Sequence, residues 1–281
     1  MSIRQTLLHI PTFPDPTAEP LLESTVALTA QLGSALTAQV LQLDSDPSSF
    51  RPIMGGYVVN YMQMMAEIAA DSEKNAAKAC EKLTKLCSHK KVALDLRRGL
   101  TRLDIPVPEL VGLARLHDLT ILPAPGPETL DYRLINAALF QSGRPVLFLP
   151  LSQRPIQLER VVVGWDFSRE AARALKDALP LLRLADDIHL VTITGEKDIG
   201  MAATASDLEK FMHAHGLSFS VHQKEKQFTP VAERLINYAE KVHADLLVMG
   251  AYGHSRFSEF ILGGATRGVL EDPPLPLLLS H

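Results

Sequence analysis

Four glycines near the C-terminus have the spacing of an anion-binding loop. Gly250 and Gly253 stand three residues apart, and after nine further residues comes the pair Gly263 and Gly264. The apolar run at residues 246–249 predicts a buried parallel strand, and ligands of open α/β sheets bind just beyond the carboxyl ends of such strands. Glycine lets a ligand approach the backbone, and the free amides of a helix that begins near Gly264 favour a phosphate by about 0.3–1 kcal/mol per charge. The alternative interpretation is that the glycines only shape a tight crossover.

A carboxylate and a hydroxyl follow an earlier apolar strand at residues 161–164. Asp166 comes two residues after this strand, where it can accept hydrogen bonds from ribose hydroxyls or from an amino group. The alternative is that Asp166 only caps the turn between this strand and the next helix. That helix is predicted over residues 169–184, with Ser168 as its N-cap. The residues leave both interpretations open.

Three polar residues lie between the glycines. Ser255 and Arg256 have donors for phosphate oxygens, although a solvated loop arginine explains the pattern equally well. His254 has no Ser, Cys or carboxylate placed by the sequence as its partner, so we assign no catalytic residue. No pattern in the chain predicts a metal site.

The elements that position these residues occur twice. The segment LTILPA at 119–124 matches LLVMGA at 246–251, and RPVLFLP at 144–150 matches LPLLLSH at 275–281. Both halves have the order βαβαβαβαβ, which predicts an α/β fold with two tandem five-stranded parallel sheets covered by helices on both faces. We place the domains at 1–150 and 151–281, with a linker near 150–157. The predicted strands are 6–10, 35–43, 91–96, 119–122 and 145–149, then 161–164, 188–193, 218–222, 245–249 and 276–279. The predicted helices are 17–32, 57–87, 107–116 and 132–141, then 169–184, 203–215 and 229–242.

The glycine spacing, together with the repeat, resembles the universal stress protein family in its tandem, two-domain type. Gly250-x2-Gly253-x9-Gly263 is similar to the family's nucleotide loop, G-x2-G-x9-G-[S/T], although Gly264 stands where ATP-binding members have Ser or Thr. The resemblance implies a Rossmann-like, adenine-nucleotide α-hydrolase-like fold and an adenine nucleotide ligand, ATP, with Mg²⁺ as an accompanying ion. The binding residues that it implies are Asp166, Ile193, Gly250, Gly253, Ser255, Arg256, Gly263, Gly264, Ala265 and Thr266.

The N-terminal half is not equipped in the same way. Its position corresponding to Asp166 is at about Thr12, and the loop after its fourth strand, PAPGPETLDYR, has one glycine, Gly126, and three prolines. Proline removes backbone amide donors that a phosphate needs. We therefore expect a degenerate first domain and at most one nucleotide site per chain.

The composition bounds the partners. The formal net charge is −4 and the pI about 6.2, which give no electrostatic reason to expect nucleic acid or an anionic membrane as a partner. The N-terminus lacks the features of a signal peptide and no apolar run has the length of a membrane span, so we expect a cytoplasmic protein.

The expected function is nucleotide-responsive regulation in the stress response, as the resemblance implies, and not rapid catalysis. Two alternatives stay open: a slow ATPase that uses the same loop, and a nucleotide-free scaffold that binds a protein or an apolar ligand through Met62, Met64 and Met65 of a long helix. The two fifth strands are short apolar edges that pairing would protect. A homodimer would provide that pairing, and so would an internal contact between the two halves.

Overall fold

The fold is described from a computed structural model of the chain. It describes residues 2–44, 58–101, 107–125, 132–151, 156–194, 205–225, 228–251, 269–270 and 273–281. The strands are β1 (Gln5–Pro11), β2 (Ala35–Leu43), β3 (Leu94–Thr101), β4 (Leu119–Pro123), β5 (Val146–Leu149), β6 (Arg160–Gly164), β7 (Asp187–Thr194), β8 (Ser220–Glu225), β9 (Leu246–Gly250) and β10 (Leu277–Ser280). The helices are α1 (Glu19–Leu32), α2 (Val58–Lys90), α3 (Val107–Ala114), α4 (Tyr132–Gln141), α5 (Arg169–Leu182), α6 (Ala205–Ala214) and α7 (Val231–Lys241).

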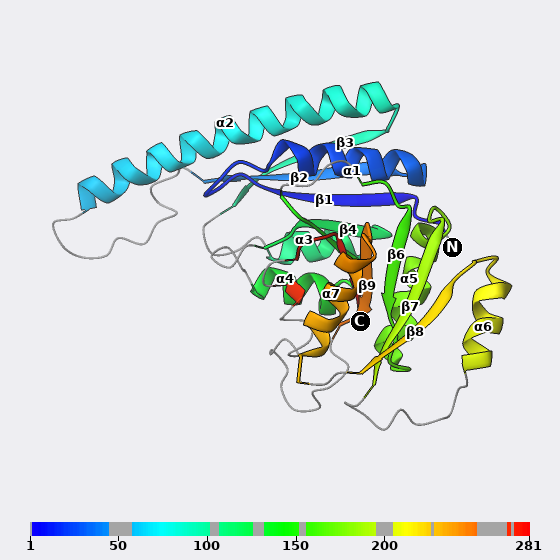
Figure 1. The fold of residues 1–281 in the computed structure, drawn as a ribbon. Coiled ribbons are helices and arrows are strands. Elements are labelled where there is room, and N and C mark those ends of the chain that lie inside the picture. The colour runs from blue at the N-terminus through cyan, green and yellow to red at the C-terminus, as the bar shows by residue number, and fades with distance from the viewer. Residues whose placement is uncertain are drawn as a thin grey trace.

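All of these strands belong to one ten-stranded sheet with the order β3-β2-β1-β4-β5-β10-β9-β6-β7-β8. Within each half the strands are parallel and follow the same order, and the two halves meet where β5 pairs antiparallel with β10. The central pair of that junction is Leu147 with Leu278. The fifth strands therefore protect each other inside the chain, and the two predicted five-stranded sheets form a single continuous one (Figure 1).

Helices cover both faces of the sheet, and each face has its own hydrophobic core. One core takes residues from α1, α2, α5 and α6, and the other takes residues from α3, α4 and α7. Successive strand residues alternate between the two cores: Val161 and Val163 of β6 belong to the first, and Val162 belongs to the second. This alternation of fully apolar faces explains why the strands are continuous apolar runs in the sequence.

Both halves contain the same aspartate contact at the amino ends of the strands. Asp118, just before β4, accepts hydrogen bonds through Oδ2 from the backbone N–H groups of Arg4 and Gln5, at 2.8 and 3.1 Å. Asp245, just before β9, does the same for Glu159 and Arg160, at 3.0 and 2.8 Å. The repeat therefore extends to individual side chains. The shared contact also shows which positions of the two halves correspond, because Gln5 has the place in the first half that Arg160 has in the second.

The halves differ most in the helix that follows their second strand. Helix α2 has 33 residues and α6 has 10. Figure 1 shows the N-terminal part of α2 extending past the sheet. Both helices lead into the third strand of their half, so the extra length of α2 lies at its N-terminal side.

Most predicted element bounds agree with the structure to within two or three residues. The predicted third strand at 91–96 is wrong at both ends, because α2 continues to Lys90 and the chain turns at Lys91, where φ is 56°, before β3 begins at Leu94. The corresponding prediction at 218–222 is early as well, since β8 is Ser220–Glu225. Both are edge strands whose exposed side chains carry no apolar run to mark their limits.

Candidate functional site

Three of the predicted ligand residues lie together at the carboxyl edge of the C-terminal half. Strands β6, β7 and β9 are adjacent, and the register pairs Gly164 with Val191 and Val163 with Val248. Two residues further along, Asp166 follows β6 level with Ile193 of β7, and Gly250 ends β9 at nearly the same height. The parallel register thus brings together residues that are far apart in sequence.

The other seven predicted residues lie outside the residues that the structure describes. They are Gly253, Ser255, Arg256, Gly263, Gly264, Ala265 and Thr266. Strand β9 ends at Gly250, and Ala251 is the last residue described in this segment. The N–H of Ala251 donates to the carbonyl of Ser280 at 2.8 Å. The predicted glycine loop therefore starts directly at the edge where Asp166 and Ile193 lie.

The turn from β6 into α5 is closed by two side chains. Asp166 accepts through Oδ1 from the backbone N–H of Ser168 at 3.0 Å, and Ser168 accepts through Oγ from the N–H of Ala171 at 3.0 Å. The N-cap prediction for Ser168 is confirmed, and the turn-capping interpretation of Asp166 is observed in these contacts. Between them, Phe167 has φ of 58°, a left-handed conformation that costs a non-glycine residue on the order of 1–3 kcal/mol.

The turn also brings a helix N-terminus to the predicted nucleotide site. Helix α5 begins at Arg169, directly after the cap, so its first amides and the positive end of its dipole lie at the carboxyl edge of β6. This arrangement favours an anionic ligand at the same edge as Asp166 and Gly250.

The packing of β9 against α5 requires glycine at position 250. Its φ is not in the positive range that Gly33, Gly143 and Gly216 adopt. A Cβ at this position would instead lie 2.5 Å from the carbonyl carbon of Glu170 and 2.6 Å from the nitrogen of Ala171. Only glycine lets the end of β9 approach the first turn of α5 this closely.

Ser280 is a residue at this edge that sequence reasoning missed. It pairs in register with Gly250, its side chain is 1% exposed, and its Oγ has no hydrogen-bond partner among the described residues. A serine at the end of an apolar strand carries no motif, so only the β9–β10 register identifies it.

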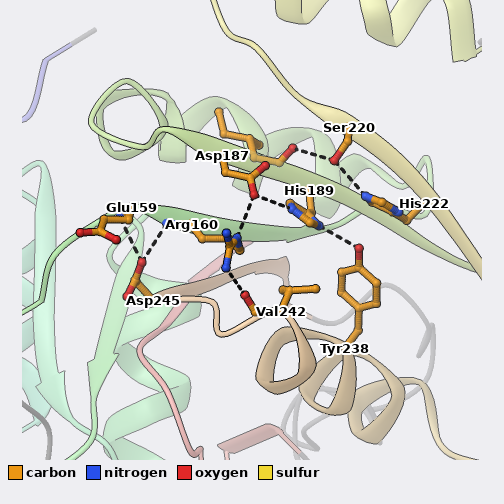
Figure 2. A network of polar contacts seen from close by, with 10 residues as sticks. Glu159, Arg160, Asp187, His189, Ser220, His222, Tyr238, Val242 and Asp245 are labelled. Atoms are coloured by element: carbon orange, nitrogen blue, oxygen red, sulfur yellow. Dashed lines mark hydrogen bonds and ion pairs between the residues drawn. The ribbon is translucent and has the colours of Figure 1, made fainter.

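A second polar cluster lies at the opposite, amino edge of the C-terminal half (Figure 2). Asp187 Oδ2 accepts from Arg160 Nε at 2.8 Å and contacts His189 Nε2 at 3.0 Å. Since a carboxylate only accepts, His189 Nε2 carries the proton, and in the neutral ring Nδ1 accepts from the hydroxyl of Tyr238 at 2.8 Å. The stacked ring of His222, with a centroid distance of 4.8 Å from His189, completes the cluster.

The hydrogen bonds of this amino-edge cluster connect Tyr238, His189 and Asp187 in the order of a catalytic proton relay, but Tyr238 is buried as in a structural cluster. Burial raises the pKa of the Tyr238 phenol, so the hydroxyl stays protonated at neutral pH, and the residue is 9% exposed. The hydrogen bond from Arg160 lowers the pKa of Asp187, and burial next to His189 lowers the pKa of His222. We therefore assign the cluster to the packing of α7 against β7 and β8.

Two kinds of site are absent from the part of the chain that is described. Within it, no three or more His, Cys, Asp or Glu residues are grouped so that they could hold a metal ion. Likewise, no described helix is both long enough and apolar enough to cross a membrane.

Comparison with known proteins supports the interpretation of this half. The model of the universal stress protein family matches residues 157–281. The C-terminal half of this chain belongs to the universal stress protein family. A universal stress protein from Synechocystis sp. is 29% identical over 137 residues, which cover 48% of this chain and 46% of that protein, so the match spans about half the length of the relative.

Solved structures extend the similarity of fold to the whole chain. A universal stress protein from Archaeoglobus fulgidus DSM 4304 has a TM-score of 0.68 at 17% identity and covers 98% of this chain and 97% of its own. A functionally unknown protein from Pseudomonas aeruginosa PAO1 has a TM-score of 0.62 at 14% identity, with 99% and 92% covered. At these identities the likeness concerns the fold, including the arrangement of two halves in one chain.

Proposed function

We propose that the C-terminal half of this protein binds an adenine nucleotide, with ATP and Mg²⁺ as the first ligand to test. The observation that carries the proposal is the carboxyl edge of β6, β7 and β9. There Asp166, Ile193 and Gly250 lie level with one another, the N-terminus of α5 faces the same edge, and the glycine loop of the family pattern follows Gly250 directly. In open α/β sheets this edge is where ligands bind.

The N-terminal half supports the restriction to one site per chain. From Gln5 and Arg160 as equivalent positions, Pro11 and not Thr12 is the counterpart of Asp166, so the assignment of about Thr12 was one residue late. Proline has neither a carboxylate nor an N–H.

Helix α2 also closes this edge of the N-terminal half. Thr12 donates through Oγ1 to the carbonyl of Leu41 at 2.6 Å, so the 2.6 Å contact with Ser72 Oγ is a donation by Ser72. Ser72 Oγ in turn accepts from the N–H of Leu43 at 2.9 Å, and Asn75 Nδ2 donates to the carbonyl of Thr12 at 3.2 Å. The ends of β1 and β2 are thus tied to α2 by the side chains of Ser72 and Asn75. We call this contact set the Ser72 latch.

The proposed role of the nucleotide is regulatory, in the stress response and in the cytoplasm. A bound nucleotide changes partner binding only as far as its affinity differs between two states of the protein. The first turn of α5 is the element through which such a difference would act, because it touches Gly250 and is capped by the turn that contains Asp166.

The test is calorimetric titration with ATP and Mg²⁺ of protein shown to be free of copurified nucleotide. We expect about one site per chain. Asp166→Asn keeps an acceptor for the Ser168 amide but removes the charge, whereas Asp166→Ala removes both; a ligand contact predicts at least tenfold weaker binding in each. Asp187→Asn, at the opposite edge of the same sheet, is the matched control. The absence of binding in nucleotide-free protein, or equal affinity in all variants, would refute the proposal.

Gly264 provides a gain-of-function test of the same site. Where the family pattern has a hydroxyl, Gly264→Ser would add one hydrogen bond to a charged phosphate, worth about 1.5–3 kcal/mol. We expect ATP to bind roughly tenfold or more tightly to Gly264→Ser, measured by the same titration. Unchanged affinity would show that this position does not contact the ligand.

The alternatives predict different results. A slow ATPase would release phosphate from ATP faster than a variant in which a bulky residue replaces Gly263. A scaffold that uses the methionines of α2 would bind its partner without nucleotide. Among these methionines Met65 is 4% exposed, Met64 is 48% exposed, and the side chain of Met62 lies outside the description. Met65 therefore belongs to the core.

A homodimer formed through the fifth strands is not needed to protect them, since β5 and β10 already pair within the chain.

A further inference from the structure

The N-terminal half has a groove at its amino edge that no part of the proposed nucleotide site uses. This open groove has a volume of about 420 Å³, within the range of about 300–1,000 Å³ typical of small-molecule sites. Its walls come from β1, β2, β3 and the segment that follows α3. Leu113 and Leu116 line it with apolar surface, and His117 and Thr37 are the buried polar residues, at 6% and 4% exposed.

The groove is the counterpart of the polar cluster in Figure 2. Gln5 corresponds to Arg160 through the shared aspartate contact, and the strand registers extend the correspondence across both halves. Five groove residues, Gln5, Ala35, Thr37, Asp95 and Arg97, thereby occupy the positions of Arg160, Asp187, His189, Ser220 and His222. Every one of those five partners belongs to the cluster.

The groove is hollow because ring side chains are missing from it. In the C-terminal half this space is filled by the stacked rings of His189 and His222 and by the phenol of Tyr238, with centroids 4.8 to 5.8 Å apart. In the N-terminal half Thr37 replaces His189. Val111 is the fourth residue from the end of α3, as Tyr238 is of α7, and its buried side chain is smaller than a phenol.

Polar groups that suit a ring hydroxyl remain. His117 Nδ1 donates to the carbonyl of Leu113 at 2.7 Å, so in the neutral ring Nε2 accepts from the hydroxyl of Thr37 at 2.9 Å. Thr37 Oγ1 uses its proton there and keeps a lone pair as an acceptor. At the rim, the guanidinium of Arg97 is held by Asp95 at 2.8 Å, and a guanidinium packs well on an aromatic face.

We propose that this groove binds a small phenol, a planar aromatic ring with one hydroxyl. The ring takes the place that Tyr238 and the histidine rings fill in the other half, between the leucines and Arg97. Its hydroxyl donates to Thr37 Oγ1, as the hydroxyl of Tyr238 donates to His189. The proposal is independent of nucleotide binding, because groove and nucleotide site lie at opposite edges of the sheet and in different halves.

The experiment is a ¹⁹F NMR titration of the full chain with 4-fluorophenol. We expect saturable line broadening with a dissociation constant on the order of 1 mM, as suits a ligand of this size. Arg97→Ala should weaken binding at least fivefold, and Ala35→Leu, which fills the groove, should abolish it. Arg98→Ala is the matched control and should bind as the wild type does, because neighbouring strand residues point to opposite faces.

Two competition arms identify the site and the ligand class. Excess ATP with Mg²⁺ should leave the broadening unchanged, and cyclohexanol, which has the hydroxyl without the aromatic ring, should compete poorly. Non-saturable broadening, or equal binding in wild type, Arg97→Ala and Ala35→Leu, would overturn the proposal. Displacement by ATP would place the probe elsewhere, and equal competition by cyclohexanol would overturn the aromatic class. If Ala35→Leu fails to fold, the pair of Arg97→Ala and Arg98→Ala still decides.

Discussion

The same substitution, glycine to alanine, should have opposite effects at two positions in this protein. At Gly250 the added methyl would lie 2.5 and 2.6 Å from backbone atoms of Glu170 and Ala171, closer than real Cβ contacts. Backbone cannot rotate away as a side chain does, so either the end of β9 or the first turn of α5 must shift. Overpacking of this kind costs about 1–3 kcal/mol, and we expect Gly250→Ala near the upper end of that range.

Gly112 is the matched control for this prediction. It lies exposed inside α3, a methyl added there would have no atom within 4 Å, and its φ is not positive, so alanine should stabilise the helix by about 0.5–1 kcal/mol. Urea unfolding should give midpoints shifted in opposite directions for Gly250→Ala and Gly112→Ala. ATP titration should show weaker binding only for Gly250→Ala, because Gly250 and the first turn of α5 belong to the proposed site, whereas Gly112 lies in the other half. A Gly250→Ala protein as stable as the wild type would refute the close approach of β9 and α5.

Three further substitutions test the Ser72 latch and the amino-edge cluster. Ser72→Ala should destabilise by about 1–3 kcal/mol in urea unfolding, because it leaves a buried N–H without its acceptor, whereas the exposed Ser88→Ala on the same helix should change little. The hydrogen bond from Arg160 lowers the pKa of Asp187, so its stabilisation is present above the unfolded value near 3.8 and is lost as pH falls through the lower folded value; Asp187→Asn should flatten that acid limb of stability against pH. Burial lowers the pKa of His222, so stability should decline as pH falls below about 6.5, and His222→Gln should remove that decline.

The fold could be predicted from sequence because its strands are buried on both faces. Continuous apolar runs such as 119–122 and 245–249 fall within a residue of β4 and β9, and their repetition predicted the two halves. Where burial is one-sided or absent, as at β3 and β8, the limits were wrong by two to five residues. The antiparallel pairing of β5 with β10 was only one of two options, since a short apolar edge does not specify its partner.

The candidate site could be predicted in part, and its physical reasons less well. The sequence indicated Asp166, Ile193 and Gly250, and the parallel register brings them to one edge. It did not indicate the close approach of Gly250 to α5, because that approach depends on tertiary packing that no local pattern encodes. It missed Ser280, and also the contact of Asp245 with Glu159 and Arg160, because an acid before a strand has no motif and its partners are more than eighty residues away.

The two halves of the sheet use opposite edges. In the N-terminal half the Ser72 latch ties α2 to the carboxyl ends of β1 and β2, while the amino edge keeps a cavity of about 420 Å³. In the C-terminal half the amino edge is filled by the rings around His189, and the carboxyl edge has the features proposed for a nucleotide site. Since equivalent positions of one repeat are compared, the difference arises from side chains and helix lengths and not from the fold. Exchange of Thr37 for histidine would therefore test how far the closed amino edge can be transferred to the other half. Because Ala35 lacks the carboxylate of Asp187 that orients His189, we expect Thr37→His alone to fill the groove without restoring the relay, and Thr37→His combined with Ala35→Asp to be needed for an ordered ring.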